Sequence, residues 1–114
     1  MEKTLFQKIA DKEIPASIVY EDERCVAFRD IAPAAPVHVL LVPRKPLPDI
    51  LAASAEDAAL LAHLMLKAGD IARAEGLSDG GFRTVINTGS DGGQTVPHLH
   101  IHIIGGRPLL WPPG

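Results

Sequence analysis

Three histidines alternate with aliphatic residues near the end of the chain, in residues 96–104. His98, His100 and His102 occupy every second position. Period-two alternation is typical of a β-strand with one polar and one apolar face. The pattern predicts that the three imidazoles project from one face, with neighbours roughly 6.6 Å apart at a rise of about 3.3 Å per residue. The alternate positions, which would face a core, are Leu99, Ile101 and Ile103.

A row of imidazoles suits metal binding, nucleophilic attack or proton transfer near neutral pH. One zinc ion fits the row poorly, because Zn–N bonds are about 2.0–2.1 Å and the outer two histidines start about 13 Å apart. The chain has a single cysteine, Cys25, and no His-Glu-x-x-His helix to complete a zinc site. A metal site and a merely solvated strand remain the alternatives, and the pattern favours a catalytic imidazole cluster.

Length and composition describe an ordinary small globular protein. The 114 residues suffice for one domain, with 46% hydrophobic and 22% charged residues. A net charge of −3 excludes a general basic surface for polymeric nucleic acid. One cysteine excludes an internal disulfide, and neither a secretory signal nor an apolar run long enough to span a membrane is visible. We therefore expect a cytoplasmic protein.

The hydrophobic pattern predicts an α+β domain with about five mostly antiparallel strands, one short helix and one long helix. Thr4 caps the short helix, which runs to about Asp11, and the long helix runs from Ser54 to a stop at Gly76. We expect the long helix to cover one sheet face and the histidines to emerge on the other face or at a sheet margin. The predicted strands are residues 17–20, 25–29, 37–43, 82–87 and 96–104.

Two further histidines are interpreted by their surroundings. His38 is the one polar side chain in the apolar strand 37–43, and a buried imidazole without a partner costs about 1–3 kcal/mol. Its partner is expected to be either the backbone or the histidine row on an adjacent strand. His63 lies off the apolar stripe of the long helix, so it is expected to be solvated. That stripe consists of Leu61, Leu64, Met65, Ala68, Ile71 and Ala72.

A glycine-rich loop, residues 88–95, leads into the histidine strand. It has three glycines, which allow positive φ and close backbone approach. A hairpin connection is the simplest interpretation. Its amides and the hydroxyls of Ser90 and Thr95, next to three histidines, also predict a cradle for an anion.

The motifs together resemble a known family. Residues 98–104 resemble the His-x-His-x-His motif of the histidine triad (HIT) superfamily. Residues 28–31, 35–38, 89–94, 105–107 and 111–114, with Asn87, resemble its histidine triad nucleotide-binding (HINT) branch. The resemblance covers almost the whole chain. It implies a single HIT domain over residues 1–114, with residues 109–114 as an extended C-terminal arm, and a homodimer whose sheets join into one.

The resemblance implies a hydrolase that cleaves the P–N bond of purine nucleoside 5′-phosphoramidates, which are AMP- or GMP-like substrates. By motif match, His100 is the nucleophile and forms a nucleotidyl-histidine intermediate. His98 and His38 support and orient it, and His102 contacts the phosphate and assists proton transfer to the leaving amine. The resemblance implies no cofactor and no membrane. It implies no metal either, since imidazole and amide N–H donors can neutralise the phosphate.

The same resemblance assigns residues to the nucleotide. Asp30 takes the ribose hydroxyls, and Asn87 and Thr95 hold the phosphate or leaving group. Thr95 stands where this branch more often has serine. Threonine keeps the hydroxyl of serine and adds a methyl group beside it. The base pocket and remaining contacts are assigned to Phe6, Ile14, Phe28 and Ile31, to Gly93 and Gln94 of the loop, and to Trp111 reaching the partner's site.

Two other functions share these residues. One is hydrolysis of dinucleoside polyphosphates, and the other is purine nucleotide binding without turnover. His102 occupies a position where glutamine accompanies nucleotidyl transfer in the superfamily, so its presence favours hydrolysis. Rates on both substrate types separate these functions.

Overall fold

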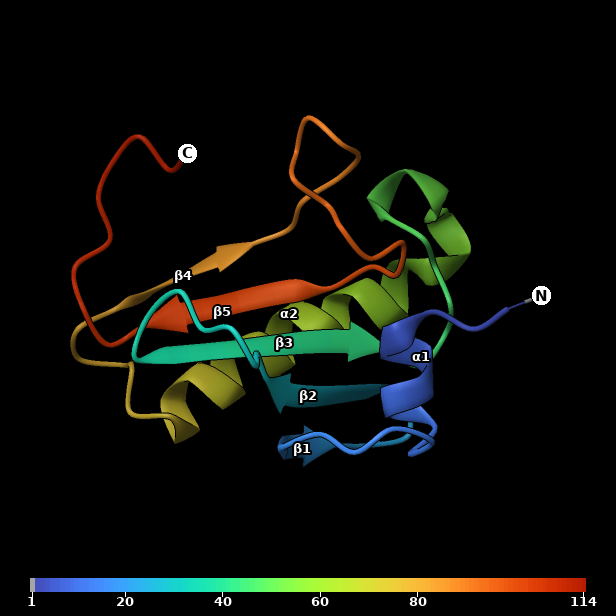
Figure 1. Cartoon of the computed structure of the whole chain (residues 1–114), viewed down its shortest axis with the longest axis horizontal. Coiled ribbons are helices and arrows are strands. Elements are labelled where there is room, and N and C mark those ends of the chain that lie inside the picture. The colour runs from blue at the N-terminus through green and yellow to red at the C-terminus, as the bar shows by residue number, and fades with distance from the viewer. Residues whose placement is uncertain (1) are drawn as a thin grey trace.

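The computed structural model describes residues 2–114, which form one five-stranded sheet with helices on both faces (Figure 1). The strand order is β1-β2-β3-β5-β4, and every neighbouring pair is antiparallel. The strands are β1 (Ile18–Glu21), β2 (Cys25–Arg29), β3 (Val37–Pro43), β4 (Phe82–Val85) and β5 (Ile101–Gly105). The helices are α1 (Leu5–Ala10) and α2 (Ala58–Ala74). The predicted α+β architecture is confirmed.

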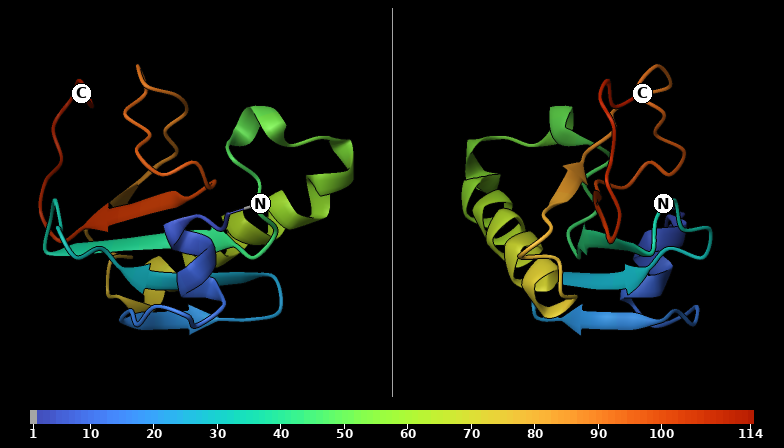
Figure 2. Two further views of the ribbon diagram at one scale, coloured as in Figure 1. Left: turned by 45° about the vertical axis from the view of Figure 1, so that its right-hand side comes forward. Right: turned by 90° about the vertical axis from the view of Figure 1, so that its left-hand side faces the viewer.

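The central strand β3 is buried on both faces because each face carries its own apolar cluster. Val39 and Leu41 pack into the cluster beneath α2, whereas Leu40 and Val42 pack into the cluster that includes α1. Viewed along the strands, α2 lies on one side of the sheet and α1 on the other (Figure 2, right). His102 in β5 lies between Ile101 and Ile103, which both enter the α2 cluster. The polar face of β5 therefore lies on the α1 side.

Helix α1 begins where the sequence predicts it. The backbone N–H of Gln7 donates to Thr4 Oγ1 over 3.0 Å, which caps the first turn. Phe6, Ile9 and Ala10 are buried against the sheet. Leu5, by contrast, is half exposed.

Helix α2 differs from its prediction at one end and on its stripe. A 3₁₀ turn, Ala55–Asp57, follows Ser54, and the α-helix proper begins at Ala58. The Ser54 N–H donates to Asp57 Oδ2 over 3.0 Å, so these two residues still organise the helix start. Gly76 has φ +79° just after the helix end, as a glycine stop requires. Met65 is exposed because it lies at the edge of the stripe, away from the sheet.

Three further predictions on local structure need correction. The predicted strand 96–104 is regular only from Ile101, and β4 is shorter than the predicted 82–87. His63 is not merely solvated, because its Nε2 lies 2.7 Å from Asp22 Oδ2. Among the residues described, no helix is both long and apolar enough to cross a membrane.

Candidate active site

His38 and His102 meet across the β3–β5 pair. In the register His38 lies opposite Ile104 and Leu40 opposite His102, so the two histidines are diagonal neighbours on one face. Their rings are 5.1 Å apart, and His38 Nε2 lies 2.9 Å from His102 Nδ1. The partner of His38 therefore belongs to the histidine row, and the backbone provides a second one.

That backbone partner fixes the protons of both rings. The Ala34 N–H donates to His38 Nδ1 over 3.0 Å, so a neutral His38 carries its proton on Nε2 and donates it to His102 Nδ1. A neutral His102 then carries its proton on Nε2, which is buried and has no hydrogen-bond partner among the described residues. Burial, with repulsion from His100 and His38, lowers the pKa of His102 to about 4. The ring is therefore neutral at pH 7 and presents an N–H to the site.

His100 is held in the complementary tautomer. Its Nδ1 lies 2.7 Å from the carbonyl oxygen of His98, and a carbonyl only accepts, so Nδ1 carries the proton. Its Nε2 is then left with a free lone pair. The ring lies 5.0 Å from the His102 ring and 4.9 Å, edge to face, from Phe6. Such a ring is oriented for nucleophilic attack through Nε2.

His98 departs from the predicted row. It precedes the regular part of β5, and its side chain is fully buried. Its Nε2 lies 2.8 Å from the Pro43 carbonyl oxygen and its Nδ1 lies 3.0 Å from Thr4 Oγ1. Burial lowers the pKa of His98 despite the bond to Pro43, so the ring is a neutral structural anchor. Two histidines of the predicted row therefore remain side by side, His102 in β5 and His100 just before it.

A hollow of about 300 Å³ is lined by Phe6, whose ring also stands 4.9 Å from the His100 ring. Its walls include all four residues predicted for the base and also Asp30 and Thr95. Asp30 Oδ1 accepts the Ala32 N–H over 2.8 Å, and its Oδ2 lies 3.5 Å from His38 Nε2. The lining that is apolar consists of Leu5, Phe6, Ile9, Ile14, Pro15, Ala16, Phe28, Ile31 and Leu40.

Comparisons of the chain with protein families, with curated proteins and with solved structures all point to one family. The model of the HIT domain matches residues 11–109. The chain belongs to the histidine triad (HIT) family. An uncharacterised HIT-like protein of Synechococcus elongatus is 61% identical over 99% of this chain and 98% of its own length. A 14 kDa zinc-binding protein of Brassica juncea is 50% identical over 97% of this chain and 99% of its own. The crystal structure of a HIT family hydrolase from Legionella pneumophila is similar with a TM-score of 0.96, at 49% identity, covering 98% of this chain and all of that one.

The glycine loop of this HIT chain is folded partly by its own amides. Gly89 N–H donates to Gln94 Oε1, and Gln94 N–H donates to the Gly89 carbonyl, each over 3.0 Å. Gly93 has φ +84°, and its N–H donates to the Ser90 carbonyl. A Cβ on Gly92 would lie 2.4 Å from the Thr88 carbonyl oxygen, so this turn requires glycine. The loop amides are therefore only partly free to hold an anion.

Two further predicted nucleotide contacts, Asn87 and Trp111, lie beyond the end of β4 and in the C-terminal arm; Asn87 comes two residues after Val85, which pairs with His102. Asn87 follows β4 and is half-buried. Trp111 is 82% exposed in the C-terminal arm, which leaves the end of β5 farther from α1 (Figure 1). Gln94 donates its side-chain amide to the carbonyls of Pro48 and Val96, so it closes the loop onto its surroundings.

The sequence reasoning missed groups whose role depends on the backbone or on distant contacts. They are Thr4, the Ala34 amide, the Pro43 carbonyl and the His98 carbonyl. The Thr4 cap was visible in the sequence, but its second contact lies 94 residues away. No pattern in the sequence indicates which carbonyl an imidazole will find.

Two other features lie apart from the HIT site. Asp22, Cys25 and His63 place one potential ligand atom each within 4.8 Å of one another. Asp22 already accepts from Tyr20 Oη, from His63 and from the amides of Arg24 and Cys25. Burial raises the pKa of the Cys25 thiol to about 12, so the thiol stays protonated. The three residues therefore form a hydrogen-bonded cluster around Asp22.

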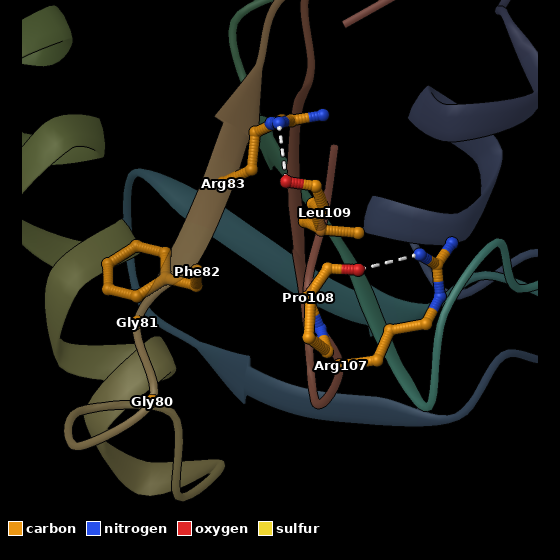
Figure 3. A pocket seen from close by; sticks show the side chains of 7 residues that line it. All are labelled: Gly80, Gly81, Phe82, Arg83, Arg107, Pro108 and Leu109. Atoms are coloured by element: carbon orange, nitrogen blue, oxygen red, sulfur yellow. Dashed lines mark hydrogen bonds between the residues drawn. The ribbon is translucent and has the colours of Figure 1, made fainter. Parts of the chain in front are cut away.

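A second hollow, of about 400 Å³, lies at the other end of the sheet (Figure 3). It is lined by residues 80–83 and 107–109, and Arg83 donates to the Leu109 carbonyl there. None of the residues predicted for catalysis or nucleotide binding lines it. The histidines and the hollow beside α1 are therefore the candidate active site.

Proposed function

We propose that this HIT protein hydrolyses the P–N bond of purine nucleoside 5′-phosphoramidates. The observation that carries the proposal is the His100 ring, whose Nδ1 proton is bound by the His98 carbonyl so that Nε2 keeps its lone pair. The resemblance to the HINT branch supplies the substrate class. A neutral imidazole is a competent nucleophile for phosphorus once the phosphate charge is offset by N–H donors.

The proposed reaction has two displacements at phosphorus. In the first, His100 Nε2 forms a bond to the α-phosphorus and the P–N bond breaks, giving a nucleotidyl-histidine. The leaving nitrogen takes a proton from solvent as the P–N bond breaks, and the His102 Nε2–H donates to the phosphate as positive charge develops on His100. In the second, water forms the new P–O bond, the His100–phosphorus bond breaks, and the proton released by the water returns to solvent. The products are the free amine and the nucleoside monophosphate.

His38 and His102 act as a pair in this scheme. Since His38 donates to His102 Nδ1, the proton of His102 is on Nε2, which is buried and has no hydrogen-bond partner among residues 2–114. A phosphate oxygen or the leaving amine would supply that partner. An unsatisfied buried donor is costly, so substrate binding there is favoured relative to binding elsewhere.

The hollow beside the histidines suits a nucleoside. Its apolar walls offer contact to a purine face, and Asp30 at its margin offers a carboxylate to ribose hydroxyls. The Phe6 ring stands 5.5 Å from Phe28 and also touches His100, so the base pocket and the nucleophile share a wall.

Zinc is the alternative that the name of the Brassica juncea relative raises. Asp30, His38 and His102 place ligand atoms within 4.8 Å of one another. However, His38 Nε2 bears a proton as long as the Ala34 amide donates to Nδ1, and a metal needs that lone pair. The donor set therefore fits zinc poorly, and no step of the reaction uses it.

We also propose a homodimer in the cytoplasm. Strand β4 is an edge of the sheet, and the apolar side chains of Phe82 at its start and Ile86 just after its end are exposed. On α2, Met65 and Leu66 are exposed as well. Pairing two such edges about a two-fold axis would cover them.

The decisive experiment compares wild type with His100→Ala on an adenosine 5′-phosphoramidate. We expect multiple turnover by wild type, a loss of several powers of ten in kcat for the variant, and nearly unchanged AMP affinity. His63→Ala is the matched control, since this histidine lies outside the site. Mass spectrometry after brief exposure should detect a nucleotidyl adduct on wild type only.

Other outcomes would identify the other functions. Faster turnover of a dinucleoside polyphosphate than of the phosphoramidate would identify a polyphosphate hydrolase. Binding of AMP without turnover of either substrate would identify a binding protein. Stoichiometric zinc after purification, with activity lost on chelation, would contradict the metal-free reaction.

A further inference from the structure

Thr4, in the capping turn of α1, contacts the buried ring behind the nucleophile. Its hydroxyl oxygen lies 3.0 Å from His98 Nδ1 and 3.0 Å from the Gln7 amide nitrogen. The Gln7 N–H can only donate, so it occupies one lone pair of Thr4 Oγ1. The hydroxyl proton is then free to be donated to His98.

The protons on His98 follow from its other contact. The Pro43 carbonyl oxygen, 2.8 Å from Nε2, only accepts, so Nε2 carries the proton and Nδ1 of the neutral ring accepts. Thr4 is the donor that satisfies Nδ1. The ring is fully buried, and a bare Nδ1 there would leave a polar atom unpaired.

The position of this ring matters because the backbone around it is irregular. His98 lies before β5, where ladder hydrogen bonds do not hold the chain. The peptide group between His98 and Leu99 is fixed on one side by the Leu99 N–H, which donates to the Leu47 carbonyl over 2.7 Å. On its other side, the His98 carbonyl accepts the Nδ1 proton of His100 over 2.7 Å. His98 itself is held by its backbone N–H, which donates to the Val96 carbonyl over 2.8 Å, and by its side chain.

We infer that Thr4 is a positioning residue for the nucleophile. Through His98 it fixes the carbonyl that holds His100 with Nε2 unprotonated. The start of helix α1 then acts on His100 in two ways. Phe6 packs against the His100 ring at 4.9 Å, and Thr4, through His98, fixes the carbonyl that accepts the Nδ1 proton of His100. The catalytic effect of this inference rests on the proposed function, whereas the tautomers do not.

Thr4→Val tests the contact, because valine keeps the shape and removes the hydroxyl. Thr4→Ser restores the hydroxyl and should rescue. Thr4→Val also removes the cap of α1, so the control is Lys8→Gly, which weakens the same helix by a comparable amount without touching His98. We expect kcat on the phosphoramidate to fall about fivefold or more in Thr4→Val, with KM little changed. Thr4→Ser and Lys8→Gly should stay within about twofold of wild type.

Nitrogen NMR of the imidazoles gives a readout that needs no turnover. In wild type we expect His98 protonated on Nε2 and His100 on Nδ1, and in Thr4→Val a mixture of tautomers at His100. The inference is overturned if Thr4→Val leaves both tautomers and kcat unchanged, or if Lys8→Gly lowers kcat equally. If wild type shows the expected tautomers and their loss in Thr4→Val but hydrolyses no phosphoramidate, the positioning role stands and the proposed function fails.

Discussion

His38 Nε2 lies 2.9 Å from His102 Nδ1, and this single contact joins the central strand β3 to the site on β5. Because the Ala34 amide occupies the other nitrogen of His38, the contact has one direction, from His38 to His102. A proton added to His102 Nδ1 would oppose the His38 N–H. The contact is therefore kept only while His102 Nδ1 carries no proton.

This pair predicts a loss of stability in mild acid. The pKa of His102 is about 4 in the folded protein, below the ordinary value of 6.5, so the unfolded ring takes up its proton first as the pH falls. The contribution of His102 to the free energy of unfolding is fully present above pH 6.5 and is lost as the pH falls from 6.5 to 4. Since the ring is only partly buried, we expect roughly 1–2 kcal/mol from it.

His102→Gln tests this source, because the glutamine carbonyl can accept from His38 and does not titrate. Urea unfolding at pH 7.5 and 4.5 should show a smaller difference for the variant than for wild type. His98 also has a lowered pKa and is present in both proteins, so its contribution cancels. Equal pH differences in the two proteins would exclude His102 as the source.

Asp30→Asn should weaken binding of AMP about tenfold or more, since charge-assisted hydrogen bonds contribute about 1.5–3 kcal/mol. Asparagine keeps an oxygen for the Ala32 amide, so the loop should be preserved. Binding of 2′-deoxy-AMP should change much less. Calorimetry on both nucleotides measures the difference, and equal losses would argue against a ribose role.

His63→Ala should destabilise the protein without affecting catalysis. Burial of the Asp22 carboxylate opposes its ionisation, but hydrogen bonds from Tyr20, the Arg24 amide, His63 and the Cys25 amide hold its pKa well below the usual range. Removing His63 takes one of these donors away and should lower the free energy of unfolding by about 1 kcal/mol. Chemical denaturation measures this loss. A change in kcat beyond about twofold would mean that α2 is coupled to the site.

Deleting residues 109–114 should change the preference among leaving-group amines more than AMP affinity. In one chain the arm is held to β4 by Arg83, which donates to the carbonyls of Leu109 and Leu110. Trp111 beyond it is exposed and free to meet a partner. Kinetics with a series of phosphoramidates measures the preference, and light scattering should show a dimer before and after truncation. An unchanged ranking of amines would remove the arm from the site, and a monomeric wild type would contradict the dimer.

Sequence patterns predicted most of the fold because burial sets the period of each element. Strand 37–43 is apolar throughout and is buried on both faces, and its bounds agree with the structure. The capped helix start at Thr4 agrees as well. The one polar side chain in that strand left the backbone and the histidine row as alternative partners of His38, and the structure provides both.

The remaining differences arise where tertiary contacts override local pattern. His98 continues the alternation in sequence, but the Pro43 carbonyl and Thr4 draw its ring into the interior before the ladder begins. His63 looked solvated on a helical wheel, yet the turn before β2 brings Asp22 to it. Neither contact is encoded by residue spacing.

The pairing of β3 with β5 also has a consequence for folding. Strands β1, β2 and β3 follow one another in sequence and are neighbours in the sheet, whereas the α2 and β4 segments intervene before β5 joins β3. Closing that long loop is the entropically expensive pairing, and it alone brings His38 to His102. Partly folded chains that have formed only the first three strands therefore lack the proposed nucleotide site. Under the proposed function, a bound nucleotide would select chains in which the last pairing is complete and would stabilise the finished sheet.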